Sequence, residues 1–198
     1  MQVGKQVLRG VLGSDGTRYE IPLYQRTFDW DKDQFEKLWT DIRNLAVARR
    51  GEPGAEHFLG TLVLDSGHRI PNDFTFLVVD GQQRLTTLTL MLAALRDIYR
   101  EYREGTDDAD ELEDGVLVHR YKKVPPERFR LWPTQGDRGE FISIIEGTPN
   151  FSSKSNLVVA YKYFRGELVR TLAENGEISI DEIRSATLDG LRFVAITA

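Results

Sequence analysis

Cysteine is absent from this chain of 198 residues, and histidine and methionine are rare, with three and two copies. Without cysteine, neither a disulfide framework nor a thiolate metal site is possible. A protein that needs no disulfides is suited to a reducing compartment. We therefore expect a cytoplasmic protein.

Long apolar runs and excess positive charge are also missing. Residues 1–5 contain no apolar leader segment, and the most apolar helix pattern carries Arg96 and Asp97 before it reaches the length of a membrane span. We therefore expect a soluble chain. The 26 Lys and Arg against 31 Asp and Glu leave a net charge of −5. This balance argues against nucleic-acid binding by bulk electrostatics, but it is compatible with a local basic pocket.

Several familiar catalytic motifs do not occur. The sequence has no Gly-x-x-x-x-Gly-Lys-Ser/Thr loop, which excludes a Walker-type nucleotide site, and its serines lie in no Gly-x-Ser-x-Gly elbow. His57, His68 and His119 show neither metal-ligand spacing nor a base partner in the sequence. We interpret them as surface or packing residues.

The patterns that are present predict an α+β fold, a small mixed sheet with packed helices, because strand and helix periodicities alternate along the chain. With 40% hydrophobic residues, the chain can bury one sizeable core. Gly60 interrupts a strand, which predicts a bulge or a close backbone approach there. The expected elements are helices at 31–50, from 82 to about 102, and after 137, 156 and 179, antiparallel strands at 57–65 and 74–79, and a strand at 191–197.

Composition divides the chain into three expected parts. Residues 1–105 form the core, residues 106–115 are acidic and are interpreted as a mobile loop, and residues 116–198 form a mostly helical extension. A helix in this extension is expected to stop at Asn175-Gly176. The last strand has no turn or polar tail after it, so we expect the chain to be a fragment of a longer protein.

The richest chemistry lies at Asp80-Gly81-Gln82-Gln83-Arg84, where a strand pattern changes to a helical one. A helix begins with unpaired backbone N–H groups and a partial positive charge, and Arg84 adds a full charge one turn inside. The motif therefore predicts an anion site at the start of the long helix.

A second motif, Tyr24-Gln25-Arg26, supplies another guanidinium and another amide. Arginine binds phosphate oxygens in bidentate fashion, glutamine can orient a water molecule, and Asp80 can hold Mg²⁺. Together the two motifs suit a polyphosphate, and Trp30 is a candidate for stacking a base. Arg84 and Arg26 would neutralise phosphate charge, while Gln82 or Gln83 would orient the attacking water.

Each of these residues also has an ordinary structural explanation. Asp80 with Gln83 has the spacing of a capping box, as do Asp31 with Gln34 and Ser179 with Glu182. Arg26 and Arg84 can pair with Asp29 or Asp41. The alternatives to a hydrolase are therefore a sensor that binds a nucleotide or modified DNA without hydrolysis, and a purely structural domain.

Four stretches of the chain resemble the N-terminal domain of GmrSD-type restriction endonucleases, the domain-of-unknown-function family two-six-two. They are residues 21–30 (Ile-Pro-Leu-Tyr-Gln-Arg-Thr-Phe-Asp-Trp), 58–61 (Phe-Leu-Gly-Thr), 80–87 (Asp-Gly-Gln-Gln-Arg-Leu-Thr-Thr) and 131–138 (Leu-Trp-Pro-Thr-Gln-Gly-Asp-Arg). The resemblance spans most of the chain, from about Tyr19 to Phe141 and more loosely to the end.

This resemblance implies a ParB- and sulfiredoxin-like core that binds and hydrolyses nucleoside triphosphates such as GTP or ATP. It also implies a role in phage defence, in which the domain senses modified DNA and controls a nuclease. Carried over by position, the catalytic residues are Asp80, Gln82, Gln83 and Arg84, with Asp80 as the metal ligand. The expected nucleotide-binding residues are Tyr24, Gln25, Arg26, Trp30, Gly81 and Thr86.

Two departures from the family pattern stand out. Phe28 occupies a position where the family often has tyrosine, which removes one hydroxyl. The chain also ends before the helical region and the His-Asn-His nuclease domain that many relatives carry, so the resemblance assigns no cleavage activity to these residues.

Overall fold

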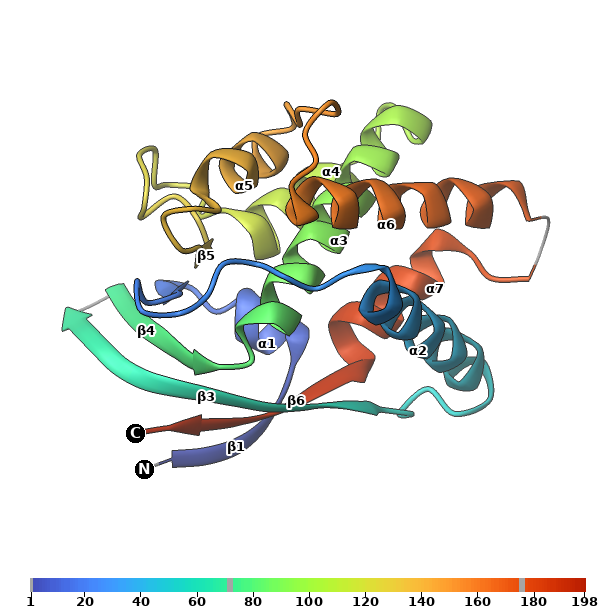
Figure 1. Cartoon of the computed structure of the whole chain (residues 1–198). Coiled ribbons are helices and arrows are strands. Elements are labelled where there is room, and N and C mark those ends of the chain that lie inside the picture. Colours follow the sequence, from blue (N-terminus) through green and yellow to red (C-terminus); the bar gives the residue numbers. More distant parts are fainter. Residues whose placement is uncertain (1, 71–72, 175–176) are drawn as a thin grey trace.

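Six strands form one mixed sheet in the computed structural model, which describes residues 2–70, 73–174 and 177–198 (Figure 1). Their order is β1-β6-β3-β4-β2-β5. The pairs β1/β6 and β3/β4 are antiparallel, whereas β3/β6, β2/β4 and β2/β5 are parallel. The α+β prediction is confirmed. The strands are β1 (Gln2–Val7), β2 (Thr17–Glu20), β3 (His57–Ile70), β4 (Asp73–Asp80), β5 (Leu131–Trp132) and β6 (Leu191–Thr197).

The helices lie on one side of this sheet, and Figure 1 shows α2, α3, α6 and α7 above β1, β3 and β6. Two of the shorter helical turns are π-helical and are labelled η1 and η2. The helices are α1 (Leu8–Leu12), α2 (Lys32–Gly51), α3 (Gln82–Tyr102), α4 (Asp108–Leu112), η1 (Glu113–Leu117), α5 (Arg138–Ile145), α6 (Asn156–Ala173), α7 (Ile180–Ser185) and η2 (Ala186–Gly190).

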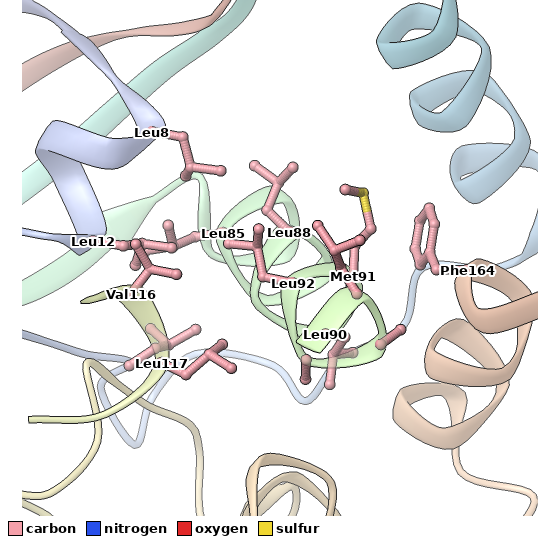
Figure 2. Packing of buried hydrophobic residues seen from close by; sticks show 14 of the residues in the cluster. Leu8, Leu12, Leu85, Leu88, Leu90, Met91, Leu92, Val116, Leu117 and Phe164 are labelled. Carbon is pink, nitrogen blue, oxygen red and sulfur yellow. The ribbon is translucent and has the colours of Figure 1, made fainter. Parts of the chain in front are cut away.

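Helix α3 is the centre of the core, as its unusually broad apolar face predicts. Leu85, Leu88 and Leu92 are fully buried. Figure 2 shows α3 side chains between those of α1 and Phe164 of α6. Each fully buried leucine stabilises the fold by roughly 1.5–3 kcal/mol. The position of α3 therefore fixes the position of its N-terminus, where the predicted site begins.

Local capping signals define where other helices start. Asp31 caps α2, because its Oδ1 accepts from the Asp33 N–H at 3.0 Å while Gln34 Oε1 accepts from the Asp31 N–H at 2.9 Å. Ser179 and Glu182 form the same reciprocal arrangement at α7. Both predicted capping boxes are confirmed. The Asp31 box sets α2 so that its apolar row, Phe35, Leu38, Trp39 and Ile42, faces the core.

The acidic stretch at 106–115 does not form the expected loop. It contains α4 and the start of η1, with Ala109 and Leu112 buried. Asp108 lies 3.2 Å from Arg103, the C-cap of α3, and 3.1 Å from Arg184 of α7. A few apolar residues suffice to order this segment, because packing against α3 and pairing with arginines from two other helices compensate for its charge.

Two further boundaries differ from the sequence prediction. The strand expected at 57–65 extends to Ile70 as β3, and the strand expected at 74–79 begins at Asp73 as β4. The strand expected at 191–197 is confirmed as β6, which lies between β1 and β3, and the segment 116–198 also contributes the short strand β5. The predicted helix stop at Asn175-Gly176 falls outside the described residues.

Candidate functional site

The turn between β4 and α3 is built on Gly81. Gly81 is the N-cap of α3 and has a φ of +96°, a conformation that residues with a Cβ rarely adopt. A Cβ at this position would lie 3.0 Å from Leu62 Cδ1 and 3.2 Å from the Thr61 carbonyl oxygen. The predicted capping box of Asp80 with Gln83 is therefore wrong, because the helix starts one residue later and Gly81 has no side chain to cap it.

The Asp80 carboxylate, freed from capping, lies at the mouth of the site. Its side chain is 67% exposed, and Oδ2 is 3.8 Å from Arg84 Nη2. Mg²⁺ commonly takes one or two carboxylates and completes its shell with water and substrate phosphate oxygens. No group of three or more His, Asp or Glu side chains in the described residues could hold a metal ion by itself. Asp80 thus supplies a single carboxylate, so a magnesium ion held here would take its other ligands from water and from a bound phosphate.

Gln83 holds the loop that carries the second motif. Its Oε1 accepts from the Asp29 N–H at 3.1 Å, and its Nε2 donates to the Thr27 carbonyl at 3.2 Å. The adjoining Phe28 ring is buried and stacks on Phe35 with a centroid distance of 6.2 Å. Both ends of the Gln83 amide are used, so this residue positions the loop.

Asp137 is a second anchor of this loop that sequence reasoning missed. Its Oδ2 accepts from the Phe28 N–H at 2.8 Å and from the Thr134 hydroxyl at 2.9 Å. The stretch 131–138 contributes to the family resemblance, but its sequence alone indicates no role. The polar residues Thr134 and Asp137 just before α5 are a signal in the sequence that could have indicated this anchor.

Arg84 is held against β3 by backbone carbonyls. Its Nη1 donates to Leu59 O at 2.5 Å and its Nη2 to Thr61 O at 3.2 Å. Gly60 lies between these carbonyls with a φ of +116°, and a Cβ there would lie 1.8 Å from Arg84 Nη1. The register of β3 against β6 shifts between Phe58 and Gly60. The predicted bulge and close approach at Gly60 are therefore confirmed.

A polar cleft of about 500 Å³ lies at the N-terminus of α3. The cleft brings together both motifs across the N-terminus of α3. Arg26 pairs with Asp29 at 2.7 Å, the ordinary ion pair that sequence reasoning kept as an alternative, yet its side chain remains largely exposed. The lining residues are Gln25, Arg26, Trp30, Val79, Asp80, Gly81, Gln82, Gln83 and Arg84.

Two predicted nucleotide-binding residues do not line this cleft. Tyr24 is 75% exposed on the loop beside it. Thr86 is 3% exposed, inside the second turn of α3. Thr86 therefore acts through packing of the helix that presents Gln82 and Arg84.

Gln82 has the most unusual environment in the cleft. The residue is only 8% exposed, and its Oε1 is buried with no hydrogen-bond partner among the described residues. Buried carbonyl oxygens are nearly always paired, and leaving one unpaired costs about 1–3 kcal/mol. Gln82 lines the cleft, but its Oε1 is shielded from solvent, so this acceptor gains a partner from the cleft only when the side chain rotates.

Fold and cleft together define an α+β domain with a polar cleft at the N-terminus of its central helix. Residues 8–196 match the family model described as GmrSD restriction endonuclease, N-terminal domain. The chain therefore belongs to this family and is a component of a restriction system. The search of curated proteins found no match. Within the described segments, no helix has the length and apolar character needed to cross a bilayer.

Proposed function

We propose that this domain binds a nucleoside triphosphate in the polar cleft and hydrolyses it. The observation that carries the proposal is the convergence of Arg26, Arg84, Gln82 and the α3 N-terminus on one cleft. These are the groups that phosphoryl transfer requires, since its catalysis consists mainly of positioning and charge stabilisation.

The phosphates are bound by cations and by the start of α3. Backbone N–H groups at a helix N-terminus favour anions, and two guanidinium groups add full charges. Arg84 uses two of its donors on Leu59 and Thr61, which holds the guanidinium in place and leaves further donors for phosphate oxygens. A preorganised cation costs little reorganisation when charge develops during reaction.

Gln82 is the residue that orients the attacking water in this proposal. Once its side chain rotates towards the cleft, Oε1 accepts from the water, whereas the Gln83 amide is committed to the loop backbone. Asp80 would hold Mg²⁺, which neutralises phosphate charge when bound. The sequence left open which glutamine orients the water, and the contacts favour Gln82.

Replacing Arg84 tests the site. We expect Arg84→Ala to lower turnover of GTP or ATP roughly 100- to 1,000-fold, as loss of one charge-stabilising donor does in other enzymes. Phosphate release with Mg²⁺ is the measurement. Arg170→Ala removes an exposed arginine of α6 and serves as the control. An Arg84→Ala protein that turns over nucleotide like the parent removes Arg84 from catalysis.

A sensor that binds nucleotide without hydrolysis is the second candidate, because Arg26 and Arg84 both already have carboxylate neighbours. It is recognised by thermal stabilisation with nucleotide and no released phosphate, since a ligand that binds only the folded state raises its stability. In either case we propose that the bound nucleotide controls a nuclease of the restriction system, and that modified phage DNA is the signal. No stabilisation by any nucleotide, by Mg²⁺ or by modified DNA supports a purely structural domain.

A further inference from the structure

A second cavity adjoins the polar cleft and shares Trp30 and Arg84 with it. Its volume is about 250 Å³, and most of its wall is apolar: Trp30, Leu38, Phe58, Leu59 and Leu88. The two cavities therefore lie next to each other, on either side of Trp30 and Arg84.

Phe58 is the unusual part of this wall. It is 60% exposed although it is a large aromatic residue on β3, whereas Leu38 and Leu88 beneath it are buried. Exposed aromatic faces next to an anion site stack planar rings, and stacking tolerates any base. The apolar wall therefore fits the ring of a nucleobase.

One edge of the cavity is polar and is centred on Asp41 of α2. Asp41 Oδ2 lies 3.2 Å from Lys37 Nζ and 3.5 Å from His57 Nε2. Both of these contacts use Oδ2, so Oδ1 remains as an acceptor for a ligand. His57, which we interpreted as a packing or surface residue, is half-buried and holds this carboxylate from the neighbouring strand.

We propose that this cavity, lined by Trp30, Leu38, Asp41, Phe58 and Leu88, receives the base of the nucleotide and that Asp41 selects guanine. The proposal rests on the proposed function of the adjoining cleft. Guanine presents two adjacent N–H donors, N1–H and N2–H, to a carboxylate. Adenine and cytosine place a donor beside an acceptor, and uracil has one N–H between two acceptors, so each brings an acceptor towards the negative charge.

The experiment compares Asp41→Asn with the parent, using non-hydrolysable analogues of GTP, ITP, ATP and XTP with Mg²⁺. The parent is expected to bind GTP most tightly and ITP roughly tenfold more weakly, because ITP lacks the exocyclic amine. Asp41→Asn should weaken GTP roughly 10- to 100-fold and improve binding of XTP. An asparagine amide can donate to the xanthine O2 while accepting from N1–H.

Two further measurements separate this proposal from the function it rests on. Tripolyphosphate probes the phosphate cleft alone, so its affinity should not change in Asp41→Asn. Phe58→Ala should weaken all four nucleotides roughly tenfold and leave tripolyphosphate unchanged. Glu36→Gln removes another carboxylate from α2 outside both cavities and is the matched control.

Several outcomes overturn the proposal. If the four nucleotides bind equally and Asp41→Asn changes none of them, the base lies elsewhere, while nucleotide binding in the cleft stands. If Asp41→Asn lowers Tm and weakens every nucleotide and tripolyphosphate together, Asp41 is only a structural ion-pair partner. If the parent binds neither nucleotide nor tripolyphosphate, the proposed function fails, and the base pocket fails with it.

Discussion

Gln82 and Gln83 are neighbours of the same type, yet their surroundings give them different roles. Successive residues of a helix point about 100° apart, so only one of the two can face the loop at 27–29. Gln83 donates to and accepts from that loop, whereas the Gln82 oxygen is buried and has no partner among the residues that the structure describes. The two glutamines therefore differ in role because their side chains have different hydrogen-bond partners.

A variant that keeps the shape of Gln82 but removes its polarity, Gln82→Met, should separate stability from activity. We expect its free energy of unfolding to stay equal or to rise by up to about 1 kcal/mol, because a buried unpaired acceptor disappears. Turnover should fall at least roughly tenfold, because nothing orients the water. Urea unfolding and phosphate release are the two measurements.

Gln6→Met on the exposed strand β1 is the control for this variant, since it makes the same change far along the sheet from the cleft. If Gln82→Met unfolds more easily than the parent and keeps full turnover, Gln82 is a packing residue and another group orients the water.

At the level of elements, the segment between β2 and α2 has no regular structure but is held at several points. Gln25 Nε2 donates to Val79 O of β4 at 2.9 Å. Gln83 of α3 bonds the backbone at Thr27 and Asp29, and Asp137 bonds the backbone at Phe28. The loop therefore presents Arg26 to the cleft from a rigid support, as binding loops on a scaffold commonly do.

Asp137→Ala should loosen this loop. Loss of the acceptor leaves the Phe28 N–H and the Thr134 hydroxyl unpaired, which costs about 1–3 kcal/mol of stability. Nucleotide affinity should fall as well, because Arg26 loses its fixed position. Thermal unfolding and nucleotide titration check both effects. Asp137→Asn keeps an acceptor oxygen and should recover most of the affinity, whereas equal losses in both variants would argue that charge matters and loop position does not.

On the scale of the whole molecule, ion pairs join helices that are distant in sequence. Arg50 of α2 pairs with Glu182 of α7, and Arg103, the C-cap of α3, lies 2.7 Å from Asp181 of α7. Burial, together with the hydrogen bond to Asp181, raises the pKa of Tyr99. These contacts hold α7 against α2 and the C-terminal end of α3.

Glu182 makes the contact between α7 and α2 sensitive to acid. Its hydrogen bond with Arg50, together with the Ser179 N–H, lowers the pKa of the carboxyl from 4.5 to about 2. A carboxylate whose pKa is lower in the folded than in the unfolded state stabilises the fold. This stabilisation is complete at pH values above the unfolded pKa and is lost progressively as pH falls from 4.5 towards 2. Glu182→Gln should therefore be less stable than the parent at pH 7, and the difference should shrink below about pH 4.5.

Urea unfolding of both proteins between pH 7 and pH 2.5 measures this difference. When both proteins also carry Arg50→Gln, most of the stability difference between the protein with Glu182 and its Glu182→Gln variant should disappear, because Arg50 is the main cause of the lowered pKa of Glu182. A difference that stays constant with pH would assign the loss to the cap of α7 and not to the charge of Glu182.

Patterns of residues that are close together in the chain were enough to predict most helices and strands and part of the site. The apolar periodicities of α2 and α3, the capping box at Asp31 and the glycine strain at Gly60 all depend on residues within a few positions of one another. The motif 80–84 predicted a site at a helix start for the same reason. These features are readable in the sequence because short-range geometry is set by the backbone itself.

Contacts between distant residues were decided only by the tertiary structure. The bond from Asp137 to Phe28 joins residues 109 positions apart, and Arg84 reaches carbonyls on β3 that it meets only after the chain has folded back. The ordering of the acidic stretch into α4 likewise depends on Arg103 and Arg184. No local pattern encodes such pairs, because packing of the whole core determines which side chains meet.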